Sequence, residues 1–89
     1  MLEQEIIISN KLGLHARASA KLVQLASSFK ADTFLQCRGR EINAKSIMGL
    51  MLLAAGKGTP LKIRVTGADE DVAMAAMVNL FERKFDEGE

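Results

Sequence analysis

The sequence LKIRVT at residues 61–66 is the cleanest strand pattern in the chain, because apolar and polar side chains alternate along it. A period of two is typical of a β-strand that buries one face and exposes the other. We expect its three apolar side chains to face a core. Lys62, Arg64 and Thr66 should then line the face that meets water.

The segments on either side of this strand predict, together with it, an α+β fold. The other predicted elements are strands at residues 4–9, 32–37 and 41–43, and helices at residues 16–29, from 46 to about 53, and after Gly67 with an acidic first turn. The order is β-α-β-β-α-β-α in a single domain over residues 1–89. It predicts one mixed or antiparallel four-stranded sheet, covered by helices on one face and open to water on the other.

Composition excludes several classes of function. Twelve basic and eleven acidic residues leave a net charge of +1, whereas a nucleic-acid binder normally has a strong basic excess. One cysteine and one histidine argue against a disulfide or a metal site. No cofactor is expected.

Apolar segments are short. The longest run, residues 47–55, is interrupted by a glycine and is well below the roughly 20 residues that span a bilayer. Glu3 and Glu5 stand where a signal peptide would carry basic charge. We therefore expect a cytoplasmic monomer with no membrane insertion.

The only histidine lies in Gly13-Leu14-His15-Ala16-Arg17, where a loop meets a helix. The first amides of a helix lack intrahelical acceptors and bind anions, and the helix dipole disfavours a cationic ring there. Neutral imidazole is a nucleophile. A phosphoryl group on His15 could be held by the amides of Ala16 and Arg17 and by the Arg17 guanidinium. The alternative is a surface histidine with no chemical role, and the spacing assigns no carboxylate to orient the ring.

A second group of residues lies in the short predicted helix after Lys45. This helix is apolar nearly all round, so some of Ile47, Met48 and Met51 should be exposed as an adaptable docking surface. Ser46 is a candidate N-cap, and its hydroxyl is also a candidate phosphorylation site beside that surface.

Together these two motifs resemble HPr, the histidine-containing phosphocarrier family of the bacterial phosphotransferase system. The resemblance covers essentially the whole chain. It rests on residues 13–17 and 45–50, two motifs whose separation along the chain matches that in the family. It implies an open-faced β-sandwich, in which a four-stranded antiparallel sheet carries three helices on one face. It also implies a stoichiometric carrier that is not an enzyme.

The family's functional residues match positions in this chain. The resemblance implies that His15 takes the phosphoryl group on Nδ1 from enzyme I and passes it to a IIA protein, with Arg17 beside the phosphate. Ser46 matches the serine that HPr kinase/phosphorylase modifies in bacteria that have that enzyme. Ile47, Met48 and Met51 match the patch that docks on enzyme I and on IIA proteins.

One position departs from the family motif, which usually has proline after the arginine, whereas this chain has Ala18. Proline early in a helix fixes φ without losing a needed N–H, so its absence should loosen the helix start slightly.

Three alternative functions remain open. The first is the nitrogen-branch paralogue, whose acceptor is a regulatory IIA protein. The second is an interaction module that acts through Ser46 without transferring phosphate, against which His15 and Arg17 argue. The third is a phosphatase or kinase with its own active site, for which the sequence offers neither an acidic metal cluster nor a nucleotide-binding loop.

Overall fold

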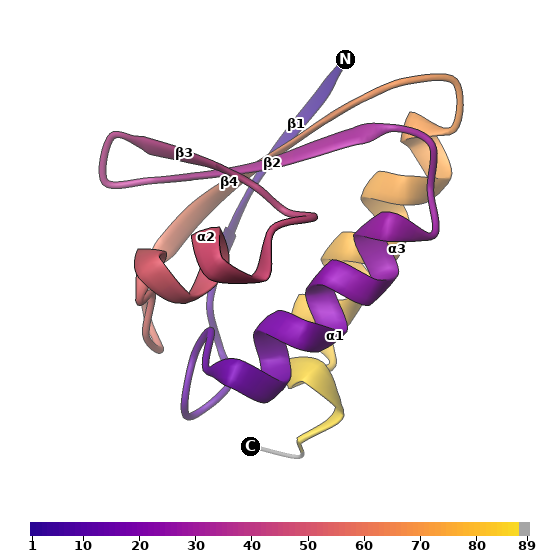
Figure 1. The fold of residues 1–89 in the computed structure, drawn as a ribbon. Coiled ribbons are helices and arrows are strands. Elements are labelled where there is room, and N and C mark those ends of the chain that lie inside the picture. The colour runs from indigo at the N-terminus through magenta and orange to yellow at the C-terminus, as the bar shows by residue number, and fades with distance from the viewer. Residues whose placement is uncertain (88–89) are drawn as a thin grey trace.

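The computed structural model describes residues 1–87, and Figure 1 shows its sheet with the helices packed on one side. The elements are β1 (Leu2–Ile7), α1 (Ala16–Ser27), β2 (Asp32–Cys37), β3 (Arg40–Asn43), α2 (Ile47–Leu53), β4 (Pro60–Thr66), α3 (Glu70–Glu82) and the 3₁₀-helix η1 (Lys84–Asp86). The strands lie in the order β1-β4-β2-β3, and every neighbouring pair is antiparallel. The predicted order of strands and helices and the open-faced antiparallel sheet are confirmed.

Strand β4 lies inside the sheet and has the predicted two faces. Its apolar side chains are exposed by 2% or less, while Lys62 and Arg64 are half-buried and Thr66 is exposed. On the open face Arg64 donates to Glu41 Oε1 at 2.6 Å, and its guanidinium lies 5.2 Å from the Phe34 ring centroid. The exposed side of the sheet is thus a polar surface with local ion pairing.

The largest differences from the predicted boundaries, two residues each, are at both ends of β1 and at the end of α1. Strand β1 begins at Leu2, because Leu2 pairs with Val65, and it ends at Ile7, two residues before the predicted end. The Ile8 amide instead donates to the Thr59 carbonyl at 3.0 Å. Helix α1 ends at Ser27, and the next residue, Ser28, donates its hydroxyl hydrogen to the carbonyl of Leu25.

The C-terminal segment contains an element that the sequence pattern does not predict. Lys84, Phe85 and Asp86 have φ values of 55°, 56° and 62°, which are unusual for residues other than glycine. Phe85 is fully buried and packs edge-on against Phe81, with ring centroids 5.0 Å apart. This anchor turns the chain back toward the start of α1 (Figure 1).

The loop between β1 and α1 lies directly against the connection from α2 to β4. Gly13 has a φ of +63°, and a Cβ at this position would lie 2.3 Å from the Ala55 carbonyl oxygen. The Leu14 amide donates to that same oxygen at 2.9 Å. Only a glycine permits this approach, which fixes the backbone two residues before His15.

No helix within residues 1–87 is long and apolar enough to cross a membrane.

The close approach at Gly13 predicts a specific stability loss. Gly13→Ala should lower the free energy of unfolding by about 2–5 kcal/mol, because it adds overpacking to an unfavourable positive φ. Gly58→Ala is the matched control, since Gly58 has a φ of +87° but a Cβ placed there would meet nothing within 4 Å. The control should lose only about 1–2 kcal/mol in urea denaturation. Equal losses in the two variants would show that the contact with Ala55 does not constrain the loop.

Candidate functional site

His15 is the N-cap residue of α1, with φ −77° and ψ 179°. Its side chain is 26% exposed. The preceding loop is held by local hydrogen bonds, in which the Gly13 amide donates to the Asn10 carbonyl at 3.2 Å and the His15 amide donates to the Gly13 carbonyl at 2.9 Å. The histidine therefore lies at the loop–helix junction where the sequence predicts it.

The first amides of α1 are available to an anion. The first N–H in the helix with a backbone acceptor is that of Ser19, which donates to the His15 carbonyl at 2.8 Å. The His15 side chain does not cap the helix. Within residues 1–87, the N–H groups of Ala16, Arg17 and Ala18 have no acceptor. Unpaired amides at the start of a twelve-residue helix form an anion-binding position.

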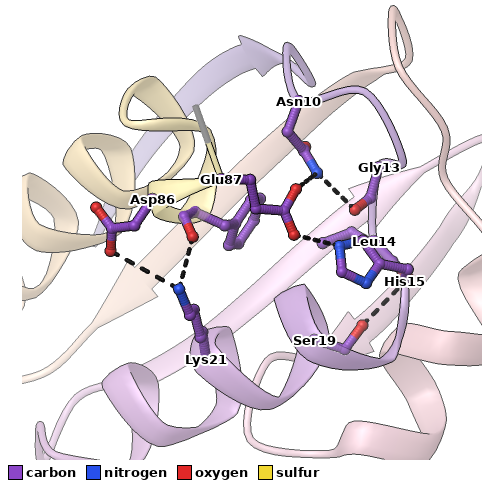
Figure 2. A network of polar contacts seen from close by, with 9 residues as sticks. Asn10, Gly13, Leu14, His15, Ser19, Lys21, Asp86 and Glu87 are labelled. Atoms are coloured by element: carbon purple, nitrogen blue, oxygen red, sulfur yellow. Dashed lines mark hydrogen bonds and ion pairs between the residues drawn. The ribbon is translucent and has the colours of Figure 1, made fainter. Parts of the chain in front are cut away.

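A carboxylate from the C-terminal segment contacts the histidine ring. Figure 2 shows the Glu87 carboxylate between Asn10 and His15, with one oxygen directed at each. Oε2 contacts Nε2 of His15, and Oε1 accepts from the Asn10 side-chain amide at 3.1 Å. The Glu87 side chain is only 16% exposed, so this contact is partly shielded from water.

Glu87 is ionised at neutral pH. Burial raises the pKa of its carboxyl, but hydrogen bonds from Asn10 and His15 and the charges of His15 and Lys21 outweigh burial and hold the pKa below its ordinary value. An ionised carboxylate can only accept hydrogen bonds. Nε2 of His15 is therefore the donor in this contact, and the ring's other nitrogen, Nδ1, faces away from Glu87 (Figure 2).

An open hollow adjoins the ring and is lined by charged side chains of both signs, among them Lys11, Arg17, Lys21, Asp86 and Glu87. Arg17 is exposed, and its side chain makes no hydrogen bond or ion pair with any described residue. Lys21 is held instead, because its ammonium donates to the Phe85 carbonyl at 2.7 Å and lies 4.0 Å from Asp86. Arg17 is thus a cation with freedom to reach an anion at the helix start.

Helix α2 exposes an apolar patch, which we define as Ile47, Met48, Met51 and Leu52, with exposures of 41%, 72%, 49% and 70%. The first three were predicted to be exposed from the sequence. The exposure of Leu52 was not predicted, although this short helix is apolar nearly all round and so indicates that some of its apolar side chains are exposed. Helix α2, which carries the patch, packs against α1, the helix that begins directly after His15.

Ser46 caps α2 as predicted. Its hydroxyl oxygen accepts from the Gly49 amide at 3.2 Å, and its φ of −112° and ψ of 107° are those of a residue outside the helix. Gly49 allows the helix to sit close to β3, because a Cβ there would lie 2.6 Å from Ile42 Cγ2. The serine hydroxyl is exposed beside the apolar patch.

The model of the family described as the PTS HPr component phosphorylation site matches residues 2–83. The chain belongs to the HPr family. It is 60% identical over 87 residues to the phosphocarrier protein HPr of Xylella fastidiosa (strain 9a5c), covering 98% of each chain. The crystal structure of HPr from Thermoanaerobacter tengcongensis superposes with a TM-score of 0.94 at 45% identity, covering 98% of both chains. A second structure from that organism, at a TM-score of 0.77 and 45% identity over 96% of this chain and 98% of the other, is described as an HPr dimer.

Membership of the HPr family makes the chain a phosphocarrier of the phosphotransferase system, which is the general function predicted from its sequence. Among residues 1–87, no group of three or more His, Cys, Asp or Glu side chains could hold a metal ion.

Ala18 stands where the HPr motif usually has proline. It is the third residue of α1, is fully buried, and has an amide without an acceptor among the described residues. Ala18→Pro should therefore lose no hydrogen bond and raise the free energy of unfolding by about 0.4–1 kcal/mol, because proline restricts the unfolded chain. Ala20→Pro is the control, since its amide lies in the regular helix, and it should be strongly destabilising. A fall in melting temperature for Ala18→Pro would show that this first turn cannot accept the proline ring.

Proposed function

We propose that this HPr-family chain takes a phosphoryl group from phosphorylated enzyme I on Nδ1 of His15 and donates it to a histidine of a IIA protein in sugar uptake. The observation that carries the proposal is the position of His15, at the start of α1 with unpaired amides beside it. The transfer needs no cofactor and no metal, and the chain acts as a stoichiometric carrier in the cytoplasm.

The chemistry follows from the ring and the helix start. The lone pair of Nδ1 attacks phosphorus as the P–N bond to the donor histidine breaks, and the leaving imidazole keeps that bond's electron pair. The amides of Ala16 and Arg17 then face the phosphoryl oxygens, and the Arg17 guanidinium adds charge-assisted hydrogen bonds. Donation to the IIA protein is the same step in reverse with a different partner.

The partners would dock on the apolar patch of α2, the helix that packs against α1. Exposed methionine adapts to more than one surface, which suits a carrier that meets enzyme I and IIA proteins in turn. His15 and the patch lie on one chain, so a monomer has every group that the transfer requires. We propose the monomer as the working unit.

Labelling tests the proposal. The chain should acquire acid-labile, base-stable phosphate when incubated with enzyme I and labelled phosphoenolpyruvate, and His15→Ala should reduce the label to background. Gln24→Ala, at an exposed position farther along α1, should label normally. Transfer onward to a sugar-specific IIA protein, faster than to a nitrogen-branch IIA protein, is expected. Label that persists in His15→Ala would place the acceptor elsewhere.

We further propose that HPr kinase/phosphorylase, in hosts that have it, modifies Ser46 and thereby inhibits docking. A negative charge at this N-cap is compatible with the helix, since helix starts favour anions by about 0.3–1 kcal/mol. A partner that covers the apolar patch must instead desolvate that charge, and every loss of about 1.4 kcal/mol weakens binding tenfold.

Ser46→Asp should therefore slow phosphorylation by enzyme I through a higher KM, while the melting temperature stays the same or rises slightly. Ser46→Ala should keep near-normal uptake and lose about 1 kcal/mol of stability with the cap. Ser27→Asp is the charge-matched control, because Ser27 is the last residue of α1, a different helix from the one that Ser46 caps. It should leave the KM unchanged. An unchanged KM for Ser46→Asp would show that Ser46 is an N-cap with no influence on phosphorylation by enzyme I.

A further inference from the structure

Asn10 connects the loop before His15 to the C-terminal segment. Its side chain is buried at 1% exposure, and its single amide nitrogen donates to the Gly13 carbonyl at 2.8 Å and to Glu87 Oε1 at 3.1 Å. Both partners are acceptors, so the Asn10 side-chain oxygen cannot take the place of the nitrogen. One buried amide thus fixes the loop and the carboxylate together (Figure 2).

The backbone that leads to Glu87 is anchored two residues earlier, at Phe85. Phe85 is fully buried, and its carbonyl accepts from the Lys21 ammonium at 2.7 Å. With Oε1 engaged by Asn10, Oε2 is left to accept from Nε2 of His15. The carboxylate is therefore positioned before any phosphoryl donor arrives.

We infer that Asn10 and Glu87 are a pair of positioning residues that select Nδ1 of His15 as the phosphoryl acceptor by holding the ring proton on Nε2. The inference rests on the proposed function. A neutral imidazole carries one N–H, so a proton held on Nε2 leaves the lone pair on Nδ1. The site then presents its nucleophilic nitrogen on the side of the ring away from the carboxylate.

The same contact stabilises the product of the transfer. When Nδ1 bonds to phosphorus, its lone pair forms the new bond and the donor's P–N bond breaks. The Nε2 proton stays in place, and the ring gains a formal positive charge that faces the Glu87 carboxylate. A charge already oriented toward the developing cation lowers the barrier to phosphoryl uptake.

The tautomer can be measured without any partner protein. In ¹⁵N spectra of the imidazole ring, recorded above its titration, the unmodified chain should show a protonated Nε2 and an unprotonated Nδ1. Glu87→Ala and Asn10→Ala should both move toward the tautomer mixture of an exposed histidine. Glu82→Ala is the matched control, because Glu82 is an exposed carboxylate at the end of α3 and lies outside the hollow beside the ring.

The rate of phosphorylation by enzyme I is the second readout. Glu87→Ala and Asn10→Ala should each lower kcat about tenfold, as expected for one charge-assisted contact that strengthens in the transition state, and Glu82→Ala should not. Amide spectra verify that each variant is folded. If Asn10→Ala does not fold, the result for Glu87→Ala alone tests the inference. A ring that keeps its proton on Nε2 in Glu87→Ala, or an unchanged kcat, overturns the inference. If the unmodified chain takes no phosphate at all, the proposed function fails, whereas the tautomer result still decides whether the pair holds the proton.

Discussion

The contact between the His15 loop and the connection after α2 is the constraint on which the site depends. Gly13 approaches the Ala55 carbonyl more closely than any other residue could, and Leu14 donates to the same oxygen. The contact fixes where α1 begins, and with it the direction of its unpaired amides. It also joins the start of α1 to the connection that follows α2, the helix that presents the apolar patch.

A second set of contacts completes the site from the C-terminal end. The buried Phe85 ring anchors a left-handed turn, which brings Glu87 against the ring of His15. The fold thus separates the two ring nitrogens by environment. Nε2 faces a carboxylate that can only accept, and Nδ1 faces away from that carboxylate.

Sequence predicts the parts of this arrangement that depend on local pattern. The period of two at residues 61–66, the serine cap of α2 and the histidine at a helix start each follow from neighbouring residues, and each is found in the structure. The contact between Glu87 and His15 joins residues 72 positions apart, and it depends on three consecutive positive φ values at non-glycine residues. No periodicity or turn signal in the sequence indicates such a segment. From the sequence pattern, Asn10 is only a loop residue. Its hydrogen bonds to Gly13 and Glu87 depend on tertiary packing, which the pattern does not predict.

The proposed carrier function depends on His15 holding the phosphoryl group on Nδ1. The most direct measurement is a ¹⁵N and ³¹P spectrum of the chain after phosphorylation by enzyme I and phosphoenolpyruvate. We expect a phosphorus–nitrogen coupling at Nδ1 of His15 and a retained proton on Nε2. Phosphorus bound to Nε2, or to any other residue, would contradict it.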